Sequence, residues 1–476
     1  MAKAAGKRKE DYSPKPGFPD SGSADRVGNG AWRLLTDHWQ EGRDTSFASI
    51  KRDRGTTGMD RRSFIHGAGA LAFATFNTLA STRARGATEM DDIKAFEIAI
   101  PEADIADKKA RLAAARWPVE VEPESWERGI PGGYLRKLAK AWGELDWRAV
   151  EAGLNRHEQV MIEHAGAKVH AFHIRSPHNE ALPLVLCHGW PSSGIEYLKL
   201  FEPLTNPTAF GGRAEDAFHL IVPTAPGFGL SPAPEVASWT SGRTAEAVLK
   251  LIDGLGYRRF GLHGTDMGSD TASKLDVMAG GRAVGLHVGT DLDSVIAVAS
   301  FTGGAMVEHN TALSDAQRER AMQLLAAAPA RSGYIAIQST RPRTLGYGLH
   351  DSPVGQLAWI GEKFAAWSDA NRERIEDAMD LDQFLTNASL YWFNGGGAGS
   401  ANALYEAFRA MDWAPPSDTP RGVAVFGADP LVRLLFDPER TIAHWSEFAA
   451  GGHFPAMEQP ELLAGDLRAF FGPLRG

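Results

Sequence analysis

The sequence predicts an α/β fold with a mostly parallel, doubly wound sheet that is interrupted by a helical insertion. Three observations predict it. Short apolar runs alternate with helical patterns in residues 181–300. A strand, a tight turn and a helix follow one another between Phe260 and Met278. From about Phe301 to Trp413 the strand pattern gives way to helices, and an apolar strand resumes at Gly422.

Composition is that of a globular chain large enough for about two to three domains. Of its 476 residues, 43% are hydrophobic and 23% are charged. The net charge of −9 argues against nucleic acid or an anionic membrane surface as a partner. The single cysteine, Cys187, excludes an internal disulfide framework and a multi-cysteine metal site, and no metal is expected.

The N-terminal part divides into two segments. Residues 1–58 are polar and lack apolar periodicity, which predicts a disordered extension. Residues 59–87 resemble a twin-arginine signal, with Arg61-Arg62 before a mildly apolar run too short to span a bilayer. This favours a periplasmic or secreted protein without an integral membrane span. A basic patch in the tail of a cytoplasmic protein, and a translation start at Met59, remain open.

Residues 88–180 begin the globular part. After an extended start, a helix is expected to open near Pro101–Asp104 and to stop before Pro118. Alternating residues at Val160–Glu163 and Val169–His173 predict a hairpin.

Residues 181–300 are expected to form the first part of the core. Leu182–Cys187 and Phe218–Val222 are continuous apolar runs, as in strands buried on both faces. Thr244–Leu255 and Thr271–Met278 have helical patterns on either side of the strand that starts at Phe260.

Residues 301–414 are expected to form a lid, and residues 415–476 the second part of the core. The helices expected in the lid are Ser314–Ala327, Pro353–Ser368 and Leu381–Phe393. The second part is expected to hold a strand at Gly422–Phe426 and helices at Arg440–Ser446 and Glu461–Phe471.

The turn after Phe260 has the small-x-nucleophile-x-small pattern of an α/β-hydrolase elbow. Gly264 and Gly268 flank Asp266, a carboxylate where an esterase has serine. A serine that attacks a saturated carbon would form a stable ether, whereas an aspartate forms an ester that activated water can hydrolyse. Asp266 therefore predicts alkyl transfer from an epoxide or alkyl halide through a covalent intermediate.

Two further groups follow in the order that this fold requires. Asp429 comes just after the strand GVAVF, and His453 lies in a glycine-rich loop before the last helix. We expect His453 to activate water and Asp429 to hold its tautomer. The oxyanion of the ester needs preformed donors, which we expect at the backbone N–H of Met267 and near Trp190.

Several motifs together resemble the microsomal-type epoxide hydrolase family: HGWPSS, PTAPGFGLS, GTDMGS, GGHF, and RW-P and DWR in the N-terminal region. The resemblance covers about residues 95–476. It implies an α/β-hydrolase core, a helical lid, an N-terminal domain at 88–180 that wraps around them, and no cofactor. The substrates it implies are a small-molecule epoxide and water, and the products are vicinal diols.

The resemblance also assigns residues. The family protonates the epoxide oxygen with two lid tyrosines, whose motifs match at Tyr334 and Tyr391. The family's acid falls on Asp429, although Gly427 replaces the usual proline of that turn. Met267 stands where tryptophan is more usual, so a changed pocket shape is expected.

Two other functions remain open at this point. A haloalkane or haloacid dehalogenase shares the aspartate and histidine but stabilises a departing halide, commonly with tryptophan N–H groups, so Trp190 keeps this alternative open. A non-catalytic ligand-binding relative would not need the full set of catalytic groups. The sequence leaves open the natural substrate and whether the chain forms a homo-oligomer.

Overall fold

The computed structural model describes residues 93–122 and 124–476. These residues belong to one compact unit, whose limits are Ala80–Gly476. The predicted extension (1–58) and twin-arginine signal (59–87) lie outside the described residues. No helix within the described part combines the length and the apolar character needed to cross a membrane.

A sheet of nine strands forms the centre of this unit, in the order β1-β2-β3-β5-β4-β6-β7-β8-β9. From β5 onward in this order the neighbours are parallel, and β1, β2, β3 and β5 pair antiparallel. The prediction of a mostly parallel α/β-hydrolase sheet is therefore confirmed. The strands are β1 (Ile93–Ala95), β2 (Gln159–His164), β3 (Ala167–Ile174), β4 (Leu182–Cys187), β5 (Phe218–Pro223), β6 (Phe260–Thr265), β7 (Ala283–Thr290), β8 (Arg421–Phe426) and β9 (His444–Phe448).

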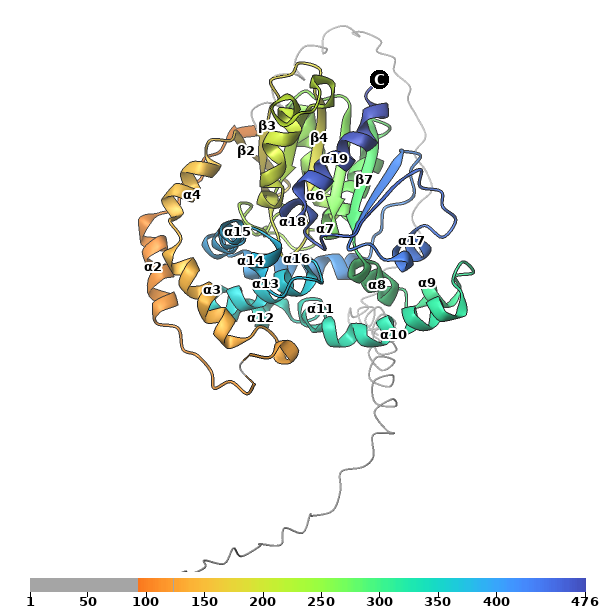
Figure 1. Cartoon of the computed structure of the whole chain (residues 1–476). Helices are drawn as coiled ribbons and strands as arrows, with labels where there is room; N and C mark the ends of the chain where they lie inside the picture. The colour runs from red at the N-terminus through yellow and green to blue at the C-terminus, as the bar shows by residue number, and fades with distance from the viewer. Residues whose placement is uncertain (1–92, 123) are drawn as a thin grey trace, which may run out of the picture. The chain divides into compact units, whose positions relative to one another are not determined.

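Helices cover both faces of the sheet, because the side chains of each strand alternate between two apolar cores. Along β4, Leu184 and Leu186 pack in the core that includes α19 (Pro460–Phe471), whereas Val185 and Cys187 face α6 (Ser241–Gly254) and α7 (Asp266–Ala279). Figure 1 shows α19 lying against the strands. The shorter elements around the core are η2 (Gly194–Leu200), α5 (Phe201–Thr205), η3 (Pro207–Phe210), η4 (Ala214–Asp216), α17 (Pro430–Phe436), α18 (Pro455–Glu458) and η5 (Gly472–Leu474).

Between β7 and β8 the chain is helical, where the lid was expected. The helices are α8 (Leu292–Phe301), α9 (Ala305–Glu308), α10 (Asp315–Arg331), α11 (Gly333–Gln338), α12 (Pro342–Asp351), α13 (Pro353–Trp367), α14 (Ile375–Ala378), α15 (Leu381–Phe393) and α16 (Gly396–Ala410). Tyr391 of α15 and Trp190 of the loop after β4 belong to one apolar cluster, which joins these helices to the carboxyl end of the sheet.

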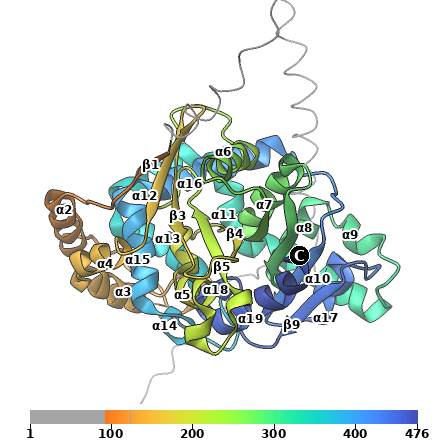
Figure 2. The ribbon, with the colours of Figure 1, turned by 90° about the horizontal axis from the view of Figure 1, so that it is seen from above.

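The N-terminal helices pack against the insertion. They are α2 (Glu102–Ala113), η1 (Trp126–Arg128), α3 (Gly132–Glu144) and α4 (Trp147–Leu154). The indole N–H of Trp142 on α3 donates to Ser389 Oγ on α15 over 2.7 Å. Figures 1 and 2 both show α2 and α3 beside the lid helices, which agrees with the contacts of α13 with α2 and α3.

One expected helix is wrong. Arg440–Ser446 was expected to be helical, but His444–Phe448 forms β9 and pairs in parallel with β8. Its side chains show why: Ser446 and His444 both donate to Asp466 on α19, while Phe448 stacks on Phe426 of β8. These tertiary contacts outweigh a weak local helical preference.

Candidate active site

Asp266 occupies the turn between β6 and α7 in a left-handed conformation with φ of +48°. The flanking glycines are required by close backbone contacts. A Cβ on Gly268 would lie 2.0 Å from the Cys187 carbonyl oxygen, and one on Gly264 would lie 2.5 Å from the Gly268 carbonyl oxygen. The strain of the turn holds the Asp266 side chain at the carboxyl end of the sheet.

The loop after β4 reaches the Asp266 carboxylate. The backbone N–H of Trp190 donates to Asp266 Oδ1 over 2.9 Å. A Cβ on Gly189 would lie 2.3 Å from Asp266 Cβ, so only glycine permits this approach. Met267 is the second residue of α7, where backbone N–H groups have no acceptor within the helix. Of the two expected oxyanion donors, the Trp190 N–H contacts the Asp266 carboxylate, and the Met267 N–H stays a prediction.

His453 faces Asp266 from the loop before α18. Its Nε2 is 3.7 Å from Asp266 Oδ2 and forms no hydrogen bond. Its Nδ1 is 2.9 Å from Asp291 Oδ2 and 3.2 Å from Ser294 Oγ. The backbone N–H of His453 donates to the carbonyl oxygen of Trp367 over 2.8 Å, which anchors the loop to the end of α13.

Asp291 is the carboxylate that contacts the histidine, and the sequence analysis missed it. It follows β7 directly and caps α8, accepting from the Ser294 N–H over 2.8 Å and the Ser294 hydroxyl over 2.7 Å. Burial raises the pKa of Asp291, but the hydrogen bonds and charge of His453 and the Ser294 bonds hold it below its usual value. The sequence signal that could have identified Asp291 is an acid directly after an apolar strand, in VGTD at residues 288–291.

Asp429 does not contact His453, which corrects its expected role. Its two oxygens accept from the guanidinium of Arg320 on α10, over 2.9 and 2.5 Å. Oδ1 also accepts from the Leu431 N–H over 2.9 Å, so Asp429 caps α17. The bidentate ion pair and the helix cap thus provide hydrogen-bond partners for both oxygens of the Asp429 carboxylate.

The surrounding charges favour the protonated form of His453. Burial lowers the pKa of His453, but the hydrogen bond and charge of Asp291, with Asp266 and Glu196, raise it to about 9. Glu196 is buried, and Thr265 Oγ1 donates to its Oε1 over 3.2 Å. Burial raises the pKa of Glu196 to about 7, against the hydrogen bonds and the charge of His453 that lower it. Nothing in the sequence pattern pointed to Glu196.

The two lid tyrosines lie in different environments. Tyr334 stacks on Trp190, with ring centroids 4.9 Å apart and planes within 5°. Tyr391 is fully buried and its hydroxyl donates to the Ser192 carbonyl oxygen over 2.7 Å. Burial and the nearby charge of Asp266 raise the pKa of both phenols, so both stay protonated at neutral pH.

A cavity of about 380 Å³ adjoins these groups. It follows α7 from Asp266 to Lys274, and eight residues of a helix span about 12 Å. Tyr334 lines it, whereas Tyr391 and His453 do not. α7 contributes mostly polar side chains to its wall, among them Ser269, Asp270, Ser273 and Lys274, whereas the rest of the wall is mostly apolar and includes Val295, Val298, Leu404 and Phe408.

Comparison with known proteins agrees with this architecture. The family model "Epoxide hydrolase N terminus" matches residues 93–197, and "Alpha/beta hydrolase family" matches residues 184–466. A Stigmatella aurantiaca protein with an epoxide hydrolase name is 40% identical over 80% of this chain and 86% of its own length. Epoxide hydrolase 1 of Sus scrofa is 31% identical over 82% of this chain and 90% of its own length.

Two solved structures share the fold. The juvenile hormone epoxide hydrolase of Bombyx mori aligns with a TM-score of 0.65 at 25% identity, over 80% of this chain and 94% of that one. The Aspergillus niger epoxide hydrolase aligns with a TM-score of 0.66 at 26% identity, over 80% and 96%. The chain therefore belongs to the microsomal-type epoxide hydrolase family of the α/β-hydrolase fold.

Proposed function

We propose that this protein hydrolyses epoxides to vicinal diols through a covalent ester on Asp266. One observation carries the proposal. The Asp266 carboxylate is bonded through Oδ1 to the Trp190 amide, while Oδ2 faces an unbonded His453 Nε2 at 3.7 Å. A nucleophile and a base thus face each other, and Asp291 orients the base through a hydrogen bond to its Nδ1.

In the first step, Asp266 Oδ2 attacks an epoxide carbon and the ring C–O bond breaks. The bond pair moves to the ring oxygen, which takes a proton from a phenol. Tyr334 lines the cavity with Asp266, so its hydroxyl is the primary donor. Tyr391 is the second donor, and its hydroxyl, which now donates to the Ser192 carbonyl oxygen, must turn to donate to the epoxide oxygen.

In the second step, water attacks the ester carbonyl and His453 takes its proton. The bond between Cγ and Oδ2 of Asp266 then breaks, Oδ2 leaves in the diol with a proton from His453, and the tyrosinate regains its proton from solvent. Esterification removes the charge of Asp266, which is one of the charges that raise the pKa of His453. The pKa of His453 therefore falls when the ester forms, and the neutral base needed for water appears at that moment. The carbonyl oxygen, Oδ1, is already bonded to the Trp190 amide, which stabilises the oxyanion.

The cavity supports an apolar substituent on the epoxide. α7 lines it with mostly polar side chains, but the rest of its wall is mostly apolar, and its extent of about 12 Å along α7 is much longer than an epoxide ring. Burial of each methylene contributes about 0.8 kcal/mol. We therefore expect kcat/KM to rise with the length of an alkyl substituent.

The dehalogenase alternative is less well supported. A halide site would need a free tryptophan N–H near Asp266, but the indole N–H of Trp190 donates to Ser400 Oγ over 3.2 Å. The test compares diol formation from a terminal epoxide with halide release from the matching alkyl halide. Diol formation that is lost in Asp266→Ala supports the proposal. Halide release without diol formation would replace it.

Export through a twin-arginine signal is a separate proposal, supported by Arg61-Arg62 before the apolar run in residues 59–87. Replacing both arginines with lysine should retain the protein in the cytoplasm. Unchanged export, or a mature chain that still begins at Met1, would contradict it.

A further inference from the structure

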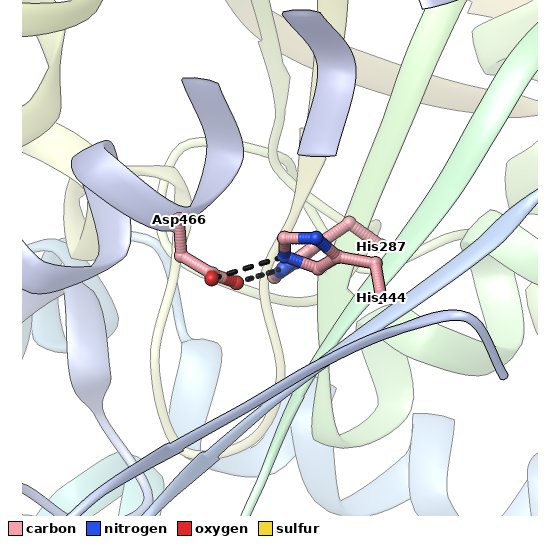
Figure 3. Close-up of side chains that lie close together, drawn as sticks. All are labelled: His287, His444 and Asp466. Atoms are coloured by element: carbon pink, nitrogen blue, oxygen red, sulfur yellow. Dashed lines mark hydrogen bonds and ion pairs between the residues drawn. The ribbon is translucent and has the colours of Figure 1, made fainter. Parts of the chain in front are cut away.

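A second polar cluster lies on the face of the sheet that α19 covers. It joins His287 on β7, His444 at the start of β9 and Asp466 on α19, and their ligand-type atoms all lie within 4.8 Å of one another. His287 Nε2 is 2.7 Å from Asp466 Oδ2, and His444 Nε2 is 3.0 Å from Asp466 Oδ1. Figure 3 shows both rings directed at the carboxylate.

The charge of Asp466 is not balanced by a permanent cation. Its side chain is 4% exposed, and its ion-pair partners among the described residues are the two histidines. Two imidazole nitrogens and a largely buried carboxylate thus converge at one place, which is the kind of ligand set that a divalent cation accepts.

We propose that His287, His444 and Asp466 form a binding site for a divalent metal ion of the zinc class. The ligands are Nε2 of each histidine and one oxygen of Asp466, a set that zinc accepts with a fourth position left to water. The two contacts of 2.7 and 3.0 Å run to different oxygens of Asp466, and the ligand-type atoms all lie within 4.8 Å of one another; tetrahedral ligands at zinc distances lie about 3.3 Å apart, so binding needs only small shifts of these side chains.

A fourth residue lets His287 act as a ligand. His263 Nδ1 is 2.9 Å from His287 Nδ1, and either ring can donate this hydrogen bond. When His287 carries its proton on Nδ1, it donates to His263 and its Nε2 lone pair faces the metal position. His263 then carries its own proton on Nε2. Because His263 Nε2 has no hydrogen-bond partner, this change of tautomer breaks no hydrogen bond of His263.

The site is accessible from one side, and none of its three ligands lines the cavity at Asp266. The His444 side chain is 25% exposed, which gives the ion a route and the fourth ligand a place. Because the ligands come from β7, β9 and α19, a bound ion would tie the last helix to the sheet. We therefore expect a bound metal ion to stabilise the fold and to have no role in the chemistry at Asp266.

The test uses the full chain without a histidine tag, stripped with a chelator and then incubated with zinc chloride. After gel filtration we expect about one zinc per chain by elemental analysis, and a rise in the melting temperature. Cobalt in the same site should show the visible absorption of a tetrahedral ion. His444→Ala and Asp466→Asn should lose zinc and the cobalt spectrum. His263→Ala should weaken binding by roughly 10- to 100-fold, because the His263 ring, which accepts from His287 and orients it, is then lost.

The matched control is His309→Ala, because His309 is an exposed histidine at the end of α9, outside the cluster. It should bind zinc as the parent does. His444→Ala decides the test if Asp466→Asn fails to fold, because the His444 ring lies at the edge of the cluster. Absence of bound zinc in the parent, or zinc binding by His444→Ala equal to that of His309→Ala, would overturn the proposal.

Discussion

Substitution of Asp291 by asparagine tests how the base is held. Asp291 Oδ2 accepts from His453 Nδ1 over 2.9 Å in a buried position. Asparagine keeps the size of the side chain but removes its charge, and its NH₂ group favours the wrong tautomer of the imidazole. The nucleophile Asp266 and its bond to Trp190 are not touched by this change.

The magnitude follows from the electrostatics of His453. Its pKa of about 9, against an ordinary value of 6.5, corresponds to roughly 3 kcal/mol in favour of the imidazolium. Asp291 provides the largest part of the favourable effects that outweigh burial. Losing most of that stabilisation slows water activation by about 10²-fold, and a wrong tautomer extends the loss toward about 10⁴-fold.

The assay is rapid-quench kinetics with a chromogenic or fluorescent epoxide, which separates ester formation from ester hydrolysis. Asp291→Asn should form the ester at a rate near that of the parent and accumulate it. Asp429→Asn is the matched control, because it loses only a partly exposed pair with Arg320, and should hydrolyse the ester within about threefold of the parent rate. If Asp429→Asn stalls hydrolysis and Asp291→Asn does not, our assignment of the acid is wrong.

Three further predictions concern the tyrosines, the elbow and the pH dependence of stability. Tyr334→Phe should slow ester formation by roughly 10- to 1,000-fold and more than Tyr391→Phe does, since only Tyr334 lines the cavity; equal rates in single-turnover assays would count against this order. Gly268→Ala should destabilise the fold by at least about 1–3 kcal/mol in urea denaturation, because its Cβ would lie 2.0 Å from a backbone oxygen; unchanged stability would contradict the elbow geometry. Folding raises the pKa of His453 to about 9, so protonated His453 should contribute roughly 3 kcal/mol to the free energy of unfolding. This contribution should be complete below pH 6.5 and lost as the pH rises through 9. If the free energy of unfolding of the parent and of His453→Gln varies with pH in the same way, this reasoning is wrong.

The local sequence pattern was sufficient to predict the positions of Asp266 and His453 and the strands of the sheet. Asp266 stands between two glycines after a buried strand, and this spacing determines the turn that presents it. His453 was placed by chain order and a glycine-rich loop. In both positions, the local backbone requirement and the tertiary position agree.

The acid could not be chosen by the same reasoning. Asp291 and Asp429 each follow an apolar strand, and β7 and β8 are neighbours in the sheet. Local pattern does not show the distant partner of each carboxylate: Asp429 pairs with Arg320 of the lid, whereas Asp291 contacts His453. The expected helix at Arg440–Ser446 failed for a related reason, because pairing with β8 and contacts to Asp466 decide that segment.

The origin of the second diol oxygen tests the covalent ester most directly. The enzyme is mixed in molar excess with the epoxide in heavy-oxygen water, so that each enzyme molecule turns over at most once. The diol is then analysed by mass spectrometry. We predict that the first turnover gives unlabelled diol and places the heavy oxygen in the peptide that carries Asp266. Complete labelling of the diol in that first turnover, with Asp266 unlabelled, would show direct attack by water and contradict the ester.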